Sequence, residues 1–212
     1  MMEPVSVVFV IDDDAAIRDA LGSLIRSIGL GVETFRSPAD FLKSEPPKTR
    51  PSCLVLDVRL PGTSGLDFQR RLAEANLDIP IIFITGHGDV QMSVRAMKAG
   101  AIDFLTKPFR DQDLIDAIQA SLEKDRARRD REMETATLRE RFESLTRREQ
   151  EIVPWIITGK PNKQIAAAIG ATEATVKVHR SQLMRKMGAE SVVALVRIAD
   201  KLRIAPAHPK HS

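Results

Sequence analysis

The chain has a single cysteine, Cys53, and no apolar run long enough to cross a membrane. One cysteine excludes an internal disulfide, and Cys53 lies at the edge of an apolar run, which favours a packed thiol over a redox or metal-binding residue. The N-terminus lacks the basic and then apolar layout of a signal peptide. These absences predict a cytoplasmic protein with no membrane partner.

Several enzyme signatures are also missing. No Ser-His-Asp set, Walker loop or HExxH motif occurs in the sequence. The first apolar run, residues 7–11, is followed by Asp12, Asp13 and Asp14, where a dinucleotide-binding fingerprint would need glycines. The sequence therefore gives no support for these classes of hydrolase and nucleotide-binding enzyme.

Charge is distributed unevenly along the 212 residues. Residues 1–125 carry 14 Lys and Arg against 19 Asp and Glu, a net charge of −5, whereas residues 144–212 carry 12 against 5, a net charge of +7. An acidic half joined to a basic half predicts two domains with different partners. The basic half has the charge that binding to nucleic acid needs.

The first half alternates strand-like segments with amphipathic ones. This repeated β–α order, with right-handed crossovers, predicts a doubly wound, five-stranded parallel sheet with helices on both faces. Asp14 and Ser37 are expected to cap two of the helices, and Pro38 suits the first turn of the second. The expected strands are residues 7–11, 31–35, 53–57, 79–88 and 101–108.

Polar side chains follow the expected strands. Asp12 and Asp13 follow the first strand, Asp57 ends the 53–57 strand, and Thr85 and Lys107 lie near the ends of the last two. Ligands of doubly wound sheets bind at the carboxyl ends of the strands, so these side chains are expected to converge. Three carboxylates call for a hard divalent cation such as Mg²⁺. The threonine hydroxyl and the lysine cation suit a phosphoryl group.

This combination, across five β–α units and about residues 4–124, resembles the receiver domain of two-component response regulators. The resemblance implies that Asp57 accepts a phosphoryl group from a sensor histidine kinase. It also implies that Asp13 and Asp57 bind Mg²⁺, or another divalent cation such as Mn²⁺, together with the main-chain carbonyl of Arg59. Asp12 would act on the metal largely through water.

The same resemblance implies how the signal is made and lost. Lys107 pairs with the phosphoryl oxygens, Thr85 moves toward them, and Phe104 is the switch aromatic. Arg59 and His87 adjust how easily water reaches the acyl phosphate. Taken alone, Thr85 would be a strand-end residue, Lys107 a surface lysine and Phe104 a core aromatic; only the joint spacing favours the functional reading.

Short helices with distinct caps are predicted in the second half. Thr146 and Glu149 form a capping-box pattern, and Pro154 is expected to kink the helix that follows, at a cost of about 3 kcal/mol relative to alanine. Asn162 is expected to cap the second helix and Thr172 the third, with a tight turn at Gly170 and Ala171 between them. A fourth helix is expected at residues 191–202.

A short helix, a tight turn and a third helix rich in Lys, Arg, His and Thr describe a helix-turn-helix DNA reader. This stretch resembles the DNA-binding domain of the LuxR group, and the two halves together resemble a NarL/FixJ-type response regulator. The resemblance places the third helix in the major groove. It assigns base-facing positions to Lys177, Val178 and Ser181, and phosphate contacts to Lys163, Thr172, Thr175 and Arg180.

Four segments are expected along the chain. They are a receiver domain at 1–124, a charged helical linker at 125–143, an all-α four-helix DNA-binding domain at 144–204 and a disordered tail at 205–212. The linker is rich in helix formers and has too few apolar positions for a coiled-coil seam.

The leading interpretation is a phosphorylation-controlled transcription regulator, not an enzyme. Its expected partners are the sensor kinase, duplex promoter DNA, a second copy of the chain after phosphorylation, and RNA polymerase. Self-association is expected where the helix at 90–98 meets the strand at 102–107. Two alternatives stay open: a phosphatase or phosphotransferase that uses Asp57 as nucleophile, although Asp57-Val58-Arg59 lacks the second acid of an Asp-x-Asp site, and an adaptor whose basic domain binds RNA or protein.

Overall fold

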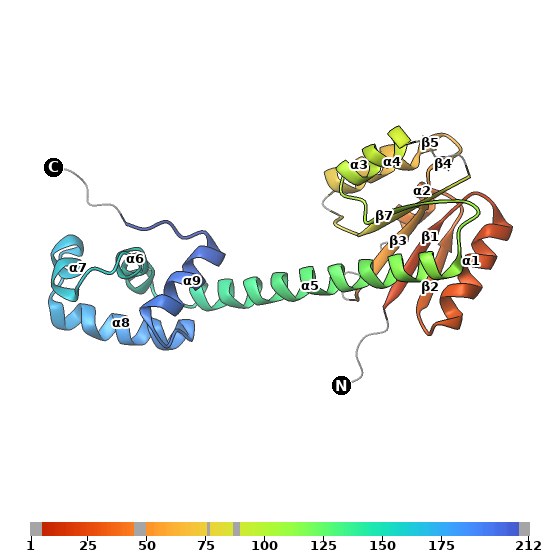
Figure 1. The fold of residues 1–212 in the computed structure, drawn as a ribbon. Helices are drawn as coiled ribbons and strands as arrows, with labels where there is room; N and C mark the ends of the chain where they lie inside the picture. Colours follow the sequence, from red (N-terminus) through yellow and green to blue (C-terminus); the bar gives the residue numbers. More distant parts are fainter. Residues whose placement is uncertain (1–5, 45–49, 76, 87–89, 208–212) are drawn as a thin grey trace. The chain divides into compact units, whose positions relative to one another are not determined.

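The computed structural model describes residues 6–44, 50–75, 77–86 and 90–207. The chain divides into two compact units, Met1–Arg129 and Asp130–Ser212 (Figure 1). None of the helices formed by these described residues combines the length and the apolar character that a membrane span requires.

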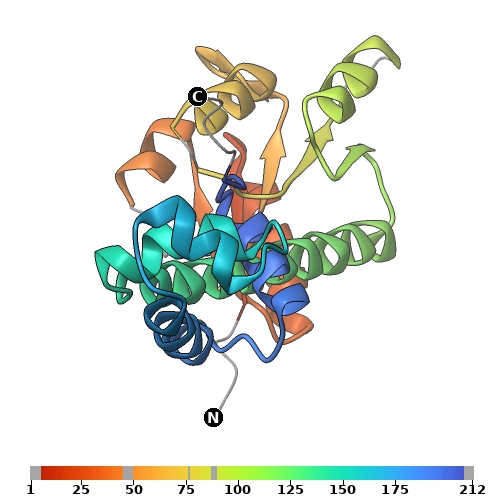
Figure 2. The same ribbon diagram turned by 90° about the vertical axis from the view of Figure 1, so that its left-hand side faces the viewer.

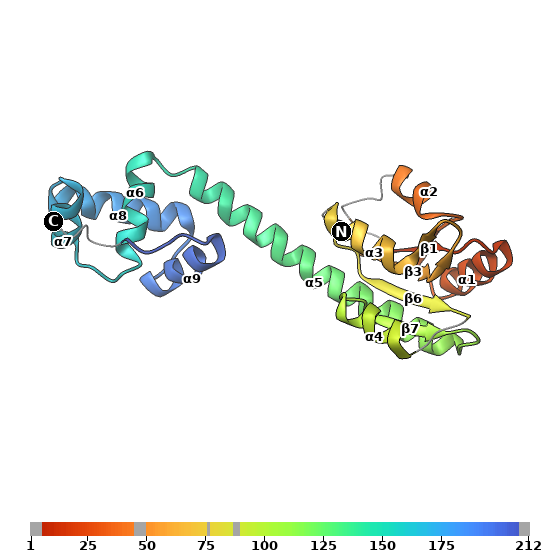
Figure 3. The same ribbon diagram turned by 90° about the horizontal axis from the view of Figure 1, so that it is seen from above.

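Unit 1 is built on a five-stranded parallel sheet with the order β2-β1-β3-β6-β7 (Figures 1 and 3). This is the doubly wound fold that the β–α order predicts, with β3 in the centre between β1 and β6. The strands are β1 (Val7–Ile11), β2 (Gly31–Phe35), β3 (Ser52–Asp57), β6 (Ile81–Thr85) and β7 (Asp103–Thr106). Every residue of β1, β3 and β6 is buried, as expected for strands covered on both faces.

Two apolar clusters cover the two faces of the sheet. On one face Phe9 and Phe83 pack with residues of the helices α2 (Pro38–Lys43), α3 (Gly65–Glu74) and α4 (Val90–Lys98). On the other face Val10 and Cys53 pack with residues of α1 (Ala15–Ser27) and α5 (Asp111–Glu143). The Cys53 thiol is fully buried, and burial raises its pKa, in keeping with a packed thiol.

The predicted caps in unit 1 are confirmed. The Asp14 side chain accepts a hydrogen bond from the backbone N–H of Ala16 at the start of α1. The Ser37 side chain accepts one from Asp40 at the start of α2, with Pro38 in the first turn. These caps satisfy backbone donors that the first turn of a helix leaves free.

A short hairpin between β3 and α3 was not predicted. Its strands, β4 (Arg59–Leu60) and β5 (Thr63–Ser64), are antiparallel and two residues long. Gly62 has a φ of 79° in the turn between them, a conformation in which a side chain would be strained. The sequence indicated a turn here, but two-residue strands leave no period to detect.

Helix α5 continues without interruption through the segment predicted as a linker, over 33 residues. Near the middle of this helix the carboxylate of Asp125 is fully buried and accepts hydrogen bonds from the backbone N–H of Ser52 at 2.8 Å and from Arg128 and Arg129. Ser52 begins β3, so this hydrogen bond joins the helix to the central strand at the end opposite to Asp57. Contacts to unit 1 thus extend past residue 124.

Unit 2 contains four further helices around one core (Figure 2). They are α6 (Arg147–Ile156), α7 (Asn162–Ile169), α8 (Glu173–Met187) and α9 (Val192–Leu202). The capping box of Thr146 and Glu149 and the cap of Thr172 are confirmed. Gly170, with a φ of 65°, ends α7 in the left-handed conformation and makes the tight turn into α8.

The structure also describes the surroundings of Asn162 and Pro154 in unit 2. Asn162 does not cap α7: Pro161 holds the cap position without a side-chain bond, and the Asn162 side chain accepts a hydrogen bond from Arg180 at 3.0 Å instead. Pro154 lies inside α6, which continues to Ile156. Of the predicted tail, 205–207 are described, and the backbone N–H of Ala207 donates to the Pro154 carbonyl at 3.0 Å; 208–212 lie outside the described residues.

Candidate functional site

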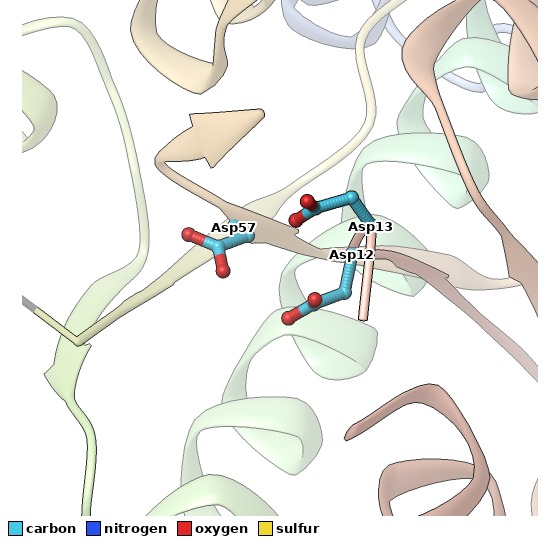
Figure 4. Close-up of side chains that lie close together, drawn as sticks. All are labelled: Asp12, Asp13 and Asp57. Atoms are coloured by element: carbon cyan, nitrogen blue, oxygen red, sulfur yellow. The ribbon is translucent and has the colours of Figure 1, made fainter. Parts of the chain in front are cut away.

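Three carboxylates meet at the carboxyl end of the sheet in unit 1. Asp12 and Asp13 follow β1 directly, and Asp57 is the last residue of the neighbouring strand β3. One oxygen from each lies within 4.8 Å of the others, and the side chains of Asp12 and Asp13 extend toward the side on which Asp57 lies (Figure 4). Parallel pairing of β1 with β3 brings residues 45 positions apart in the sequence to one point.

Lys107, the residue that follows β7, completes this cluster. Its ammonium nitrogen lies 2.7 Å from Asp12 Oδ2 and 2.9 Å from Asp57 Oδ2. The Asp12 side chain is only 1% exposed, whereas those of Asp57 and Lys107 keep 11% and 19%. The site is therefore recessed, and Asp57 and Lys107 keep more exposed surface than Asp12 does.

Backbone groups hold the two recessed carboxylates in place. Asp12 Oδ1 accepts the N–H of Asp14 at 2.9 Å, and Asp57 Oδ1 accepts the N–H of Arg59 at 2.9 Å. The carbonyl oxygen of Asp12 accepts a hydrogen bond at 2.7 Å from the guanidinium of Arg18, which lies on α1. Each of the oxygens that Lys107 does not contact thus has a partner of its own.

The electrostatics of the cluster follow from burial and from these contacts. Burial raises the pKa of Asp12, and the negative charge of Asp57 adds to this, although Lys107 and the backbone N–H of Asp14 act in the opposite direction. Burial by itself lowers the pKa of Lys107, but the hydrogen bonds to Asp12 and Asp57 outweigh it and raise that pKa. One lysine thus leaves the three acids short of positive charge.

A hard divalent cation fits this donor set. All three ligand atoms are carboxylate oxygens, which Mg²⁺ and Mn²⁺ prefer, and they are close enough to share one ion. Burial is the main cause that raises the pKa of Asp12, and a bound cation would act against it by favouring the charged carboxylate. The site thus fits the cation that the residue types suggest.

Of the remaining predicted residues of the receiver, Thr85, Phe104 and Arg59 lie in the part of the chain that the structure describes. Thr85 ends β6 and is fully buried, and its carbonyl accepts the backbone N–H of Lys107 at 2.7 Å. Phe104 is partly buried on β7, with its ring centroid 6.3 Å from that of Phe83. Arg59 is exposed on β4. His87 lies outside the described residues.

Gly65 allows α3 to begin directly against the end of β3. Its backbone N–H donates to the carbonyl of Val58 at 2.9 Å. A Cβ atom at this position would lie 2.5 Å from the carbonyl oxygen of Asp57 and 3.2 Å from the Phe83 ring. The absence of a side chain here therefore lets the helix pack directly beside Asp57.

The predicted DNA-contacting residues lie on α7, α8 and the turn between them. Lys177, Ser181 and Lys163 are exposed, and Val178 is 56% exposed. The hydroxyls of Thr172 and Thr175 lie 2.8 Å apart at the start of α8. These side chains are accessible to a nucleic acid.

Two residues of α8 have specific environments within unit 2. Arg180, predicted to contact a phosphate, is half-buried and donates to Asn162 Oδ1. His179 Nδ1 is buried, and it has no hydrogen-bond partner among the described residues. Arg180 thus bridges the two helices of the helix-turn-helix. His179 Nδ1 accepts or donates no hydrogen bond within the described residues, so this atom does not fix the ring to the backbone.

Arg18, Gly65 and Asp125 were not singled out from the sequence. Arg18 looked like one charge on the exposed face of an amphipathic helix, and Asp125 like one acid in the run Lys124–Arg131. Their partners lie on other elements, up to 73 residues away in the case of Asp125 and Ser52. Gly65 carried a turn signal, but nothing in the sequence showed which atoms it would approach.

Comparison with known families matches both units. The model for the response regulator receiver domain matches residues 8–119, and the model for bacterial regulatory proteins of the luxR family matches residues 143–205. The chain belongs to the response regulators. It is a transcription regulator controlled by phosphorylation, with a LuxR-type helix-turn-helix domain.

Relatives of this response regulator share both domains. Nodulation protein W of Bradyrhizobium diazoefficiens is 51% identical over 207 residues, covering 98% of this chain and 91% of the relative. Response regulator protein TodT of Pseudomonas putida is 48% identical, with 96% and 89% covered. Transcriptional regulatory protein FixJ of Rhizobium meliloti is 39% identical, with 91% and 94% covered. The resemblance to FixJ-type regulators is thus confirmed over nearly the whole chain.

Solved structures agree with this assignment. The response regulator StyR matches with a TM-score of 0.82 and 46% identity, covering 93% of this chain and all of the other. Full-length FixJ from B. japonicum matches with a TM-score of 0.56 and 38% identity, covering 93% and 97%. The receiver fold and the helical DNA-binding domain inferred from the sequence are therefore those of the family.

Proposed function

We propose that Asp57 is the phosphoryl acceptor of this response regulator and that a sensor histidine kinase is the donor. The observation that carries this is the position of Asp57 at the end of the central strand, partly exposed and 2.9 Å from Lys107. Transfer forms a bond between an Asp57 carboxylate oxygen and phosphorus and breaks the phosphorus–nitrogen bond of the kinase phosphohistidine. The product is an acyl phosphate.

Asp12, Asp13 and Asp57 are proposed to hold Mg²⁺, or another divalent cation such as Mn²⁺, with the main-chain carbonyl of Arg59. When bound, the ion neutralises charge on the phosphoryl oxygens. Lys107 already lies between two acceptor oxygens at the same edge and supplies a second cation for those oxygens. The chain's own residues therefore orient the acceptor and balance the charge that the phosphoryl group adds.

Phosphorylation is proposed to control dimer formation through α4 and β7. Thr85 moves toward the phosphoryl group, and Phe104 turns into the space that it leaves. The support is an apolar surface on α4, where Val90, Val94 and Met97 are 79%, 44% and 46% exposed. Two copies of one helix-turn-helix would then bind a two-part promoter site.

Promoter binding is proposed to place α8 in the major groove. Lysine can donate to guanine edges and valine can contact a thymine methyl, so Lys177, Val178 and Ser181 are assigned to bases. The residues assigned to phosphates are Lys163, Thr172, Thr175 and Arg180. The net positive charge of residues 144–212 supports this assignment.

Labelling with acetyl phosphate tests the acceptor directly. With Mg²⁺ the wild-type chain should gain one hydroxylamine-sensitive phosphoryl group, and Asp57→Asn should gain none. Asp14→Asn is the matched control, because Asp14 caps α1 and asparagine caps equally well. Wild-type labelling of Asp57→Asn, or labelling that persists in EDTA, would contradict the proposal.

Gel shifts and sedimentation test the output. Lys177→Ala should weaken binding to a selected duplex, whereas Lys201→Ala should not, because Lys201 lies on α9 and pairs with Glu134. Duplex should compete better than single-stranded DNA or RNA.

Beryllofluoride with Mg²⁺ should convert monomer to dimer, and Val94→Glu should prevent it. The same mass in both states would rule out control by dimerisation.

A further inference from the structure

Asp13 is the least supported member of the acidic cluster. Its side chain is exposed, and no hydrogen bond to its carboxylate is found among the described residues. Asp12, by contrast, is held at its backbone N–H by Phe35, at both carboxylate oxygens by Asp14 and Lys107, and at its carbonyl by Arg18. What directs the Asp13 carboxylate toward Asp12 and Asp57 must therefore come through the backbone.

The contact between Arg18 and the Asp12 carbonyl supplies that constraint. The carbonyl of Asp12 and the N–H and Cα of Asp13 belong to one planar peptide group. A donor that holds the carbonyl oxygen at 2.7 Å therefore also fixes the orientation of this peptide and the position from which the Asp13 side chain leaves it. Arg18 lies on the second turn of α1, so the helix itself is the rigid support.

We infer that Arg18 is a positioning residue for the cation site: it acts through the Asp12–Asp13 peptide and holds Asp13 ready to bind a divalent ion. The inference rests on the proposed metal-dependent function of the cluster. Groups that orient metal ligands typically change metal affinity by roughly 10- to 100-fold when they are removed. Arg18→Met should produce a loss of this size.

The charge of Arg18 makes the inference testable by sign. A guanidinium beside the cluster repels a divalent cation, so if charge alone mattered, Arg18→Met would bind Mg²⁺ more tightly. If positioning dominates, Arg18→Met binds more weakly. Arg18→Lys keeps the positive charge and offers an ammonium N–H donor in place of the guanidinium, so it should recover part of the Mg²⁺ affinity that Arg18→Met loses. Arg26→Met, on the same helix and away from Asp12, is the matched control.

Metal binding is measured by calorimetry with Mg²⁺ and by the electron paramagnetic resonance of Mn²⁺, both without any phosphoryl donor. Labelling by acetyl phosphate, which needs no kinase, then gives a second readout. Arg18→Met should raise the Mg²⁺ concentration needed for half-maximal labelling by at least about tenfold. The labelling rate at saturating Mg²⁺ should stay close to that of the wild type.

The outcomes separate this inference from the proposed function. Absence of Mg²⁺ binding by the wild-type chain would contradict the proposed function. Wild-type binding with unchanged or tighter binding by Arg18→Met would overturn the role of Arg18 and leave the function intact. If circular dichroism shows that Arg18→Met folds poorly, Arg18→Lys and Arg18→Gln are compared instead. Positioning by Arg18 predicts that the Mg²⁺ affinity of Arg18→Lys lies between that of the wild type and that of a well-folded Arg18→Gln.

Discussion

Gly65 allows a direct test of how closely α3 approaches the strand β3, which ends at Asp57. A Cβ at this position would lie 2.5 Å from the Asp57 carbonyl oxygen and 3.1 Å from the Cα of Val58. Both contacts are with backbone, which cannot rotate away as a flexible side chain can. Gly65→Ala must therefore move the start of α3 or the end of β3.

The cost of that movement can be bounded. Placing one extra methyl group in a well-packed region typically destabilises a protein by about 1–3 kcal/mol. The contact in this case is with backbone and includes the Phe83 ring at 3.2 Å, so we expect the upper part of this range. Displacement of Asp57 from Lys107 should also slow labelling by acetyl phosphate, because reacting groups lose rate steeply with small errors in position.

Gly22→Ala is the control with the opposite sign. Gly22 lies within α1, and an added Cβ would meet only the Arg26 guanidinium, at 3.2 Å. Replacing a glycine inside a helix by alanine should stabilise unit 1 by about 0.5–1 kcal/mol. Both substitutions add one methyl group, so the difference between their effects on the stability of unit 1 reports on the surroundings of Gly65.

The assay must report on unit 1 alone. Trp155, the sole tryptophan, lies in unit 2, and the chain has no tyrosine. Amide hydrogen exchange with denaturant gives a free energy of opening for the strands β1 and β3 directly. Equal stability of Gly65→Ala and the wild type, with an unchanged labelling rate, would refute the reasoning, since α3 could then shift at no cost.

Three further predictions concern two buried acids and the proline inside α6. Asp125→Asn should destabilise unit 1 by about 3 kcal/mol in hydrogen exchange, because Arg128 and Arg129 lose their buried counter-charge. Glu149 is buried, which raises its pKa, but hydrogen bonds from Lys186 and Thr146 outweigh burial and lower it. The stability that Glu149 contributes to unit 2 is therefore present above about pH 4.3 and lost as the pH falls through the lowered pKa. Glu149→Gln should remove this acid dependence when unfolding of unit 2 is followed by Trp155 fluorescence. Pro154→Ala should stabilise unit 2 by at most about 3 kcal/mol in the same experiment, and lower stability would show that proline is preferred in α6.

The sequence by itself determined those features that depend on neighbouring residues. Apolar runs predicted strands buried on both faces, and β1, β3 and β6 are such strands. Asp14, Thr146 and Thr172 predicted helix starts, since a cap and the N–H groups that it accepts lie within three residues. The acids at the ends of adjacent strands predicted the cluster, because the β–α order restricts how parallel strands can be arranged.

Only the tertiary structure decided contacts between elements that are distant in sequence. The distances from Lys107 to Asp12 and Asp57, the approach of Gly65 to Asp57 and the hydrogen bond from the backbone N–H of Ser52 to Asp125 depend on strand register and helix placement. The Asn162 cap was wrong for the same reason: Arg180, on the next helix, takes its side-chain oxygen. Local patterns fix which backbone conformation is favoured, whereas the partner of a polar side chain is set by whatever the packed core brings within hydrogen-bonding distance.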